Sequence, residues 1–532
     1  MGNGRKILTS LAVLLGPSLV LAEAASRAPE VEIANGTIRG GRCASGTVNY
    51  FLSIPYAVPP VGDLRFTPPQ PYNQTFAGVR DATTPAPSCP QLGMFLVAYQ
   101  AGQSEDCLFV DVWAPANATE DPKLPVKVWL HGGGNSAGGI SFPLYDGCNS
   151  DTAAVHVSLN YRLGALGFLV AEPAGLLGNY GLRDQILALR WVQENIEAFG
   201  GDKHKVVVFG QSAGGLDAHI LATLDEAPSL MKSAIMQSGA GQSVQDLPSV
   251  AAFSAKFAAL LPCGANDVAC LRAATPEHLN TTLLSMFLNG SDGFVFEFNG
   301  FGPAVDGGLV PAHPTEAGVK VPSLIGSTAH EGTLLLYASY GNATASLDQT
   351  DYDQTLVSNF GSQAAIVNDT YPVSRYSSTR LPVFYAVDDI YTSSVIHCAA
   401  FNALTSSANA APVYTFVFNH TATCPWLPSI APGALELLGP AHTSELALVF
   451  GQVRRLPFGT GSCNLTGQEA ALAAYLQAAW TSMAGAGNPG PDWPEFAESS
   501  MLGVVLNDAP VPGVVDYSEC AFWEGLKSQD PA

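Results

Sequence analysis

One serine stands where the chain could present it as a nucleophile. Residues 210–214 read Gly-Gln-Ser-Ala-Gly, after a Val- and Phe-rich run at 205–209 and before a helix-like stretch at 216–224. In the order strand, tight turn, helix, a G-x-S-x-G motif projects the serine Oγ from the edge of a sheet. A side chain at either glycine would collide with the neighbouring elements. We therefore expect Ser212 to attack a carbonyl group, with an ordinary glycine-rich turn as the alternative.

A second glycine-rich segment supplies the partner that such a serine needs. Residues 126–130 read as a buried strand and run directly into His131 and three glycines. An HGGG motif after a strand is the oxyanion-binding segment expected beside a G-x-S-x-G nucleophile, because glycine lets the backbone approach a ligand closely. We assign the N–H groups of Gly133, Gly134 and Ala213 as oxyanion donors, with the positive end of the following helix behind them. The alternative is a flexible glycine loop.

The elements that would position these groups alternate between strand and helix. Six short runs read as buried strands: residues 126–130, 154–159, 205–209, 233–237, 323–326 and 414–418. Residues 182–199 have apolar side chains along one helical face. This alternation predicts an α/β fold with a mostly parallel sheet covered by helices. Less regular helical stretches, roughly 250–290 and 345–410, look like insertions over the same sheet, so we predict one catalytic domain at 25–532.

The composition excludes several classes of protein. Of the 532 residues, 47% are hydrophobic and 13% are charged, and the formal net charge is −22. Disorder needs low hydrophobicity and high charge, and nucleic-acid binding needs a basic footprint. The 23 Lys and Arg residues are instead scattered along the chain. We therefore expect a large core and no nucleic-acid partner, and we interpret the acidity as a source of colloidal solubility.

The N-terminal residues and the cysteines predict secretion. Residues 1–24 have the basic, apolar and small-residue regions of a signal peptide, and a Gly-Pro pair interrupts the apolar run, which disfavours a membrane anchor. The ten cysteines include no C-x-x-C pair, so we expect disulfides rather than a zinc site. The nine sequons that are candidates for N-glycosylation are Asn35, Asn73, Asn117, Asn280, Asn289, Asn342, Asn368, Asn419 and Asn464.

Several segments resemble the type-B carboxylesterase/lipase family. Residues 104–113 are similar to its EDCL signature, and residues 51–60 fit its N-terminal region. The likeness continues in fixed order through residues 160–164, 178–185, 210–215 and 237–239, and it covers about 30–525. The resemblance implies the α/β-hydrolase fold and acyl transfer from a small-molecule ester, with no metal or organic cofactor. The family also includes lipases, cholinesterases and non-catalytic adhesion relatives.

The resemblance also implies the remaining catalytic residues. The order on this fold is nucleophile, acid, histidine. Residues 439–446 resemble the family's G-x-x-H-x-x-E-L segment, which makes His442 the general base. The family places its acid in a Glu-Gly pair, which makes Glu331 the acid, although His330 stands where relatives often carry Asn or Asp. Asp306 is the alternative acid. A non-catalytic relative is disfavoured because the serine and the histidine are both present.

Disulfides and the residues around the site bear on the substrate. The resemblance implies the pairs Cys89–Cys107 and Cys263–Cys270, and for the remaining cysteines we expect Cys43–Cys148, Cys398–Cys424 and Cys463–Cys520. The first loop holds Met94, Phe95, Leu96, Val97 and Tyr99 but no Trp, and Gln211 stands where cholinesterases carry Glu, so choline esters are disfavoured. The family's interfacially activated lipases have a longer flap at this loop, so the resemblance also disfavours a long-chain lipase. Asn135 is interpreted either as a polar contact near the acyl group or as a turn residue.

Overall fold

The computed structural model describes residues 28–91, 102–118, 123–264, 267–288, 294, 296 and 300–527. The predicted signal peptide and the apolar loop residues 94–99 lie outside the described residues.

One sheet of eleven strands organises the described chain, in the order β18-β17-β16-β15-β12-β11-β7-β8-β6-β4-β3. The central strands are parallel: β8 (Val155–Leu159), β7 (Leu124–Leu130), β11 (Gly201–Gln211), β12 (Ser233–Gln237), β15 (Ser323–Thr328), β16 (Val413–Phe418) and β17 (Leu502–Leu506). The edges are antiparallel: β18 (Val511–Val514) on one side and β6 (Phe109–Pro115), β4 (Val48–Pro55) and β3 (Gly41–Arg42) on the other. The mostly parallel sheet confirms the predicted α/β class.

Alternate side chains of the central strands enter two cores, one on each face of the sheet. Val206 and Val208 of β11 pack in the core that contains apolar residues of α3 (Tyr180–Asn195) and α4 (Ala213–Thr223). Val207 and Phe209 pack in the core that contains α17 (Gly467–Ala486). Because successive strand side chains point to opposite faces, β-branched residues at consecutive positions bury both faces. The sheet is thus covered by helices on both sides.

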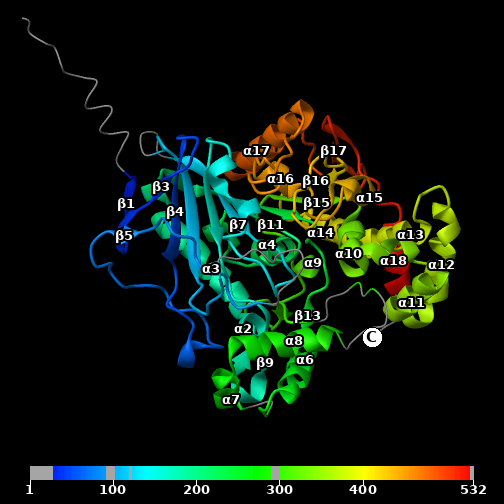
Figure 1. Ribbon diagram of the computed structural model, residues 1–532, viewed down its shortest axis with the longest axis horizontal. Helices are drawn as coiled ribbons and strands as arrows, with labels where there is room; N and C mark the ends of the chain where they lie inside the picture. The colour runs from blue at the N-terminus through cyan, green and yellow to red at the C-terminus, as the bar shows by residue number, and fades with distance from the viewer. Residues whose placement is uncertain are drawn as a thin grey trace, which may run out of the picture.

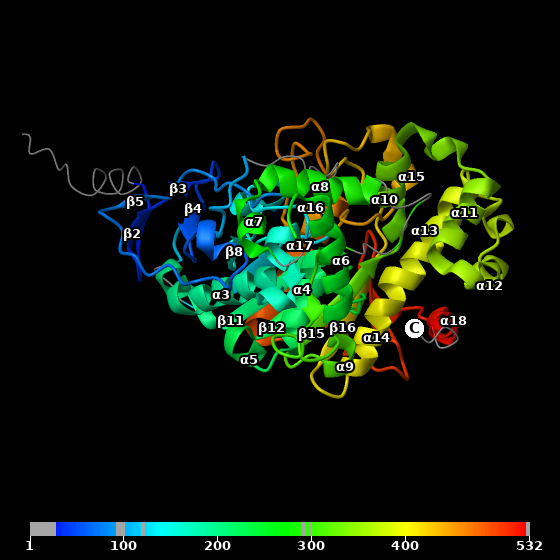
Figure 2. The same ribbon diagram turned by 90° about the horizontal axis from the view of Figure 1, so that it is seen from below.

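The two stretches predicted as helical insertions are helical. The first contains α6 (Leu247–Leu260), α7 (Val268–Ala273) and α8 (Pro276–Leu288), and the second contains α11 (Gln349–Phe360), α12 (Ala364–Thr370), α13 (Pro382–Tyr391), a π-helical segment (Thr392–His397) and α14 (Cys398–Ser407). Figures 1 and 2 show α11, α12 and α13 gathered with α18 (Cys520–Lys527) at the end of the molecule opposite β1 (Glu30–Ile33), β2 (Gly36–Arg39) and β5 (Arg80–Asp81).

All ten cysteines are in disulfides, and two of the expected pairs are wrong. Three bonds are those expected: Cys43–Cys148, Cys89–Cys107 and Cys263–Cys270. The expected pairs Cys398–Cys424 and Cys463–Cys520 do not form; the bonds are Cys398–Cys520 and Cys424–Cys463. The reason is helix packing, since α14 begins at Cys398 and lies against α18, which begins at Cys520. Separation along the chain does not reveal that contact.

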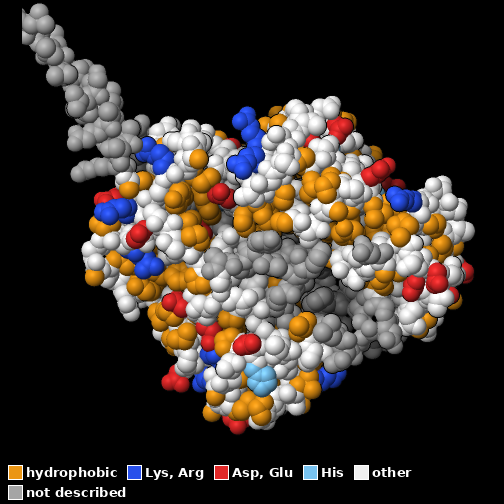
Figure 3. Space-filling model, viewed as in Figure 1, with side chains coloured by type: hydrophobic (Ala, Val, Ile, Leu, Met, Phe, Trp, Pro, Cys, Tyr) orange, Lys and Arg blue, Asp and Glu red, His pale blue; other side chains and the backbone are white. Residues whose placement is uncertain are grey.

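The surface has few cations, and its sequons differ in exposure. On the described part of the face in Figure 3, Lys and Arg side chains occupy small separate groups. Within the described residues, no helix combines the length and apolarity needed to cross a membrane. Asn289 lies outside the described residues, and among the sequon asparagines whose exposure the structure describes, four are exposed: Asn73, Asn117, Asn419 and Asn464. Asn35 is buried, and its Nδ2 donates to the carbonyls of Tyr72 and Gln74.

Candidate active site

Ser212 lies on a sharp turn between β11 and α4. Its backbone has φ 58° and ψ −128°, a conformation that costs free energy in a non-glycine residue and is typical of functional turns. The turn closes only because glycines flank it: a Cβ on Gly210 would lie 2.2 Å from the carbonyl oxygen of Gly214. A Cβ on Gly214 would lie 2.1 Å from the carbonyl oxygen of Leu130. The structure thus brings the partly exposed serine to the carboxyl end of the central strands.

The glycine-rich loop that leaves β7 passes directly over this turn. A Cβ on Gly132 would lie 3.1 Å from the Cβ of Ser212. The loop then turns tightly, with Gly133 at φ 116° and Gly134 at φ 61°, and the carbonyl of Gly133 accepts hydrogen bonds from the two N–H groups at 136 and 137. Ala213 begins α4, so its N–H has no intrahelical partner. The three predicted oxyanion donors therefore lie on the two segments that meet at Ser212.

His442 and Glu331 form a buried pair. His442 Nδ1 lies 2.5 Å from Glu331 Oε2, and the two residues are 5% and 0% exposed. The other carboxylate oxygen accepts a hydrogen bond from Thr328 N at 2.6 Å. The N–H of Glu331 donates to Thr392 Oγ1 at 2.9 Å. With one oxygen held by the backbone, the other is directed at the imidazole.

Backbone and side-chain contacts bring the two loops of this pair together. The N–H of His330 donates to the carbonyl of Pro440 at 3.1 Å, and His330 forms a β-bridge with Ala441. The His330 ring contacts Asp388 Oδ2 of α13 at 2.6 Å, and the other oxygen of Asp388 accepts from Gly332 N at 2.8 Å. His330, which departs from the family pattern, thus links the acid-bearing loop to a helix of the second insertion.

The charge state of His442 follows from its surroundings. Burial lowers its pKa, but the nearby Glu331 carboxylate, the hydrogen bond to it and the Glu445 carboxyl outweigh burial, so the pKa of His442 is raised above its ordinary value. The Nε2 of the ring lies 3.0 Å from Gln211 Nε2. If Nδ1 carries the proton shared with Glu331, Nε2 is the acceptor and the Gln211 amide donates to it. Among the described contacts, the side chain next to His442 Nε2 is that of Gln211 and not that of Ser212.

Several residues around the pair had no role assigned to them from the sequence, although Glu445 and Gln237 lie in the family-like segments 439–446 and 237–239. Glu445 is buried and its carboxyl pKa is raised to about 7, mainly by burial. Its Oε1 accepts from Gln237 Nε2 at 2.9 Å, and Gln237 Oε1 in turn accepts from Trp480 Nε1 at 3.1 Å. Thr392 and Asp388, in contrast, lie in no segment that the sequence analysis singled out. The alternative acid, Asp306, instead accepts from the N–H groups of its own turn and from Asn179.

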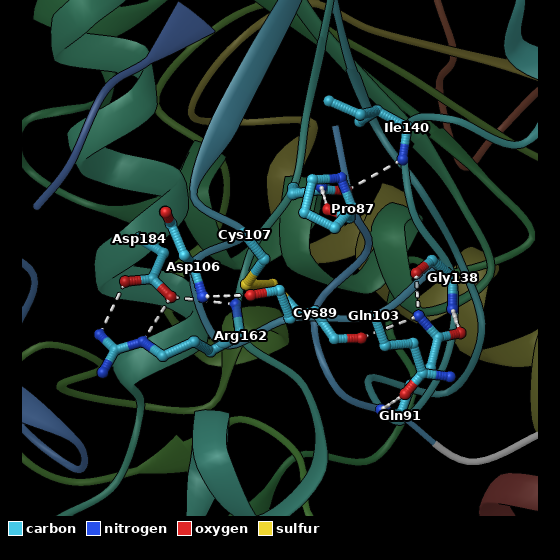
Figure 4. The surroundings of a disulfide bond; sticks show 12 residues. Pro87, Cys89, Gln91, Gln103, Asp106, Cys107, Gly138, Ile140, Arg162 and Asp184 are labelled. Atoms are coloured by element: carbon cyan, nitrogen blue, oxygen red, sulfur yellow. Dashed lines mark hydrogen bonds and ion pairs between the residues drawn. A yellow bond between two sulfur atoms is a disulfide. The ribbon is translucent and has the colours of Figure 1, made fainter. Parts of the chain in front are cut away.

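The loop closed by the Cys89–Cys107 disulfide contacts the glycine-rich loop of the site. Figure 4 shows Gln91, two residues beyond Cys89, facing Gly138 of the glycine-rich loop. The Gln91 side chain both donates to the Gly138 carbonyl at 2.7 Å and accepts from the Gly138 N–H at 2.9 Å. The disulfide loop and the glycine-rich loop therefore hold each other in place.

Comparison with known proteins decides the family. The model of the carboxylesterase family matches residues 27–523. The chain belongs to the carboxylesterase family. It is 33% identical to the para-nitrobenzyl esterase of Bacillus subtilis, over 86% of this chain and 91% of that protein, and 31% identical to the human cocaine esterase, over 90% and 88%. A solved thermophilic PNB esterase superimposes with a TM-score of 0.78 at 31% identity, covering 94% of this chain and 100% of that one.

Family membership agrees with the geometry of the site. The carboxylesterase match includes every predicted site residue. The structural similarity confirms the α/β-hydrolase fold. As a carboxylesterase, the protein is a carboxylic ester hydrolase, which makes a small-molecule ester its substrate class.

Proposed function

We propose that this carboxylesterase is a secreted enzyme that hydrolyses esters through Ser212, His442 and Glu331. The observation that carries the proposal is the buried His442–Glu331 pair, with its Nδ1–Oε2 distance of 2.5 Å, next to the turn that bears Ser212. Gln211 belongs to that turn and touches His442, so the imidazole lies within one side chain of the serine. The five disulfides and the exposed sequons support an oxidising, extracellular compartment.

The proposed reaction is a two-step acyl transfer. The Gln211 amide first leaves His442 Nε2. This nitrogen then takes the hydroxyl proton of Ser212 while Ser212 Oγ attacks the ester carbonyl. Glu331 holds the imidazole tautomer and stabilises the imidazolium. The N–H groups of Gly133 and Ala213, with that of Gly134, bind the oxyanion, and each donor typically contributes about 3 kcal/mol to the transition state. His442 protonates the departing alcohol, and water then releases the acid from Ser212 by the same steps.

The test combines hydrolysis with covalent labelling. The purified protein is assayed with p-nitrophenyl esters of two to sixteen carbons and treated with a p-nitrophenyl phosphonate, and the labelled peptide is identified by mass. We expect hydrolysis, a label on Ser212, and loss of both in Ser212→Ala. Ser229→Ala is the matched control, because Ser229 is an exposed serine whose Oγ donates to the carbonyl of Glu226. Activity that falls steeply beyond short acyl chains supports the short-loop prediction.

Two outcomes contradict the proposal. Full activity in Ser212→Ala would refute the nucleophile. A wild-type protein that neither hydrolyses any ester of the series nor takes the label would identify a non-catalytic relative.

A further inference from the structure

A buried carboxylate lies between the two segments that supply the oxyanion donors. Asp217 belongs to α4 and is 0% exposed. It follows Ala213 by four residues, so the two side chains lie on the same face of the helix. Helical side chains lean toward the N-terminus, which directs this carboxylate toward the first turn of α4. Asp217 therefore lies beneath the turn that bears the proposed nucleophile.

The carboxylate of Asp217 binds the residue that follows the glycine run. Its Oδ1 accepts a hydrogen bond from Asn135 Nδ2 at 3.1 Å, and its Oδ2 accepts one from Gln185 Nε2 of α3 at 2.6 Å. The amide oxygens of Asn135 and Gln185 are buried and have no partner in the described chain. Both amides are therefore oriented by the carboxylate, and the Asn135 side chain is directed at Asp217.

The Asn135 bond holds the middle of the glycine-rich loop, whereas other contacts hold its ends. At one end, Tyr161 stacks on His131 with ring centroids 4.5 Å apart and donates its hydroxyl to the His131 carbonyl. At the other end, Gln91 holds Gly138. Asn135 lies between them at φ 51°, a left-handed conformation that Asn and Asp tolerate better than other side chains. Its carbonyl also accepts from the N–H at 164, so both its backbone and its side chain are fixed.

We propose that Asp217 is a positioning residue of the active site, which fixes the N–H groups of Gly133 and Gly134 relative to Ala213 N by binding Asn135. The proposal rests on the proposed function. Burial raises the pKa of Asp217 to about 7, which reflects the free-energy cost of an anion held by two neutral amides. A small apolar side chain would avoid that cost, but it would leave the loop without this link to the nucleophile helix.

The test is a set of variants at the two ends of the hydrogen bond. Asp217→Leu removes the acceptor. Asn135→Asp places two carboxyl groups against each other, and combining it with Asp217→Asn exchanges the two ends and restores a carboxylate–amide pair. Asp111→Leu is the matched control. Asp111 of β6 is also buried and its pKa is also raised to about 7, but its Oδ1 accepts from the N–H of Ser53, away from the glycine-rich loop.

Activity is measured per active site, counted by phosphonate titration. We expect Asp217→Leu and Asn135→Asp to lower kcat about 100-fold with KM changed less than about twofold, because a displaced donor costs transition-state binding. The exchanged double variant should recover kcat to within about fivefold of the wild type, and Asp111→Leu should keep it within about twofold. Wild-type kcat in Asp217→Leu, or no recovery in the exchanged variant, would overturn the inference.

Hydrogen–deuterium exchange separates this inference from the proposed function. We expect amides at 132–139 to exchange faster in Asp217→Leu than in the wild type, with no such change in Asp111→Leu. This readout needs no ester hydrolysis. Unchanged exchange in Asp217→Leu would overturn the positioning role, whereas an unlabelled and inactive wild-type protein would overturn the proposed function alone.

Discussion

The nucleophile side and the acid–base side of the active site are built by different means. On the nucleophile side, the turn that bears Ser212 closes through close approaches between backbone atoms, such as Gly214 against the carbonyl of Leu130. On the acid–base side, Glu331 and His442 are held by side chains from distant segments, among them Thr392. The turn at Ser212 therefore depends on the absence of side chains at its glycines, and the acid–base pair depends on the presence of side chains around it.

This difference predicts how each side fails. Backbone atoms cannot move away from an added Cβ without shifting a strand, so a substitution at the glycines of the turn changes the fold and the chemistry together. A side chain on the acid–base side can be replaced by one of similar shape, so its chemistry can be removed while the packing remains.

The largest effect is expected for Gly214→Ala. The new Cβ would lie 2.1 Å from the Leu130 oxygen, which is part of a central strand. We expect kcat/KM to fall more than about 1,000-fold and the melting temperature to fall with it, as measured by hydrolysis and thermal unfolding. Gly302→Ala is the control, because a Cβ at Gly302 meets nothing within 4 Å and its φ is not positive. A stable and active Gly214→Ala protein would contradict the description of this turn.

Glu331→Gln is expected to separate chemistry from stability. The amide keeps the shape of the carboxylate but cannot stabilise the imidazolium, so kcat should fall about 1,000-fold. The melting temperature should change much less than in Gly214→Ala, since no backbone atom has to move. Equal losses of stability in the two variants would remove the distinction between the two sides.

For the same reason, the nucleophile side leaves a local pattern in the sequence and the acid–base side does not. Glycines at 210 and 214 leave a local pattern, and the structure places Ser212 on the turn that this pattern predicted. Glu331 and His442 were inferred only from family resemblance, because 111 residues separate them. Thr392, which accepts the N–H of Glu331, leaves no pattern in the sequence. It lies in a π-helical segment, Thr392–His397, of a distant insertion. The two wrong disulfide predictions have the same cause: the bond between Cys398 and Cys520 depends on a contact between α14 and α18, which are distant along the chain.

Thr392→Val tests the most hidden part of the acid–base side. Valine has the same shape but no Oγ1, so the buried N–H of Glu331 loses its acceptor, at a cost of about 1–3 kcal/mol. We expect kcat to fall about tenfold, with a lower melting temperature. Thr355→Val is the control: Thr355 of α11 is also buried, but its hydroxyl donates to a helix carbonyl, and no backbone N–H of the described residues donates to it. An unaltered kcat in Thr392→Val would show that Glu331 is held by its other contacts.

The smallest expected effect concerns a contact that joins the two sides, from Gln211 on the nucleophile turn to His442 Nε2. His442 acts as a base when neutral, and its pKa is raised above the ordinary 6.5, so kcat/KM should increase with pH through a midpoint above 6.5. A carboxylate in place of the amide favours the imidazolium and raises that pKa further, in addition to the effects of Glu331 and Glu445. In Gln211→Glu the midpoint should therefore move to higher pH.

The ratio of kcat/KM at pH 6 to that at pH 8 should fall about threefold in Gln211→Glu, since a tenfold change corresponds to a full unit of pKa. Gln349→Glu makes the same charge change at an exposed position on α11 and should leave the pH profile unaltered. A profile for Gln211→Glu that matched the wild type would mean that residue 211 does not face Nε2 in solution. The Gln211 amide could then not be the group that the serine displaces.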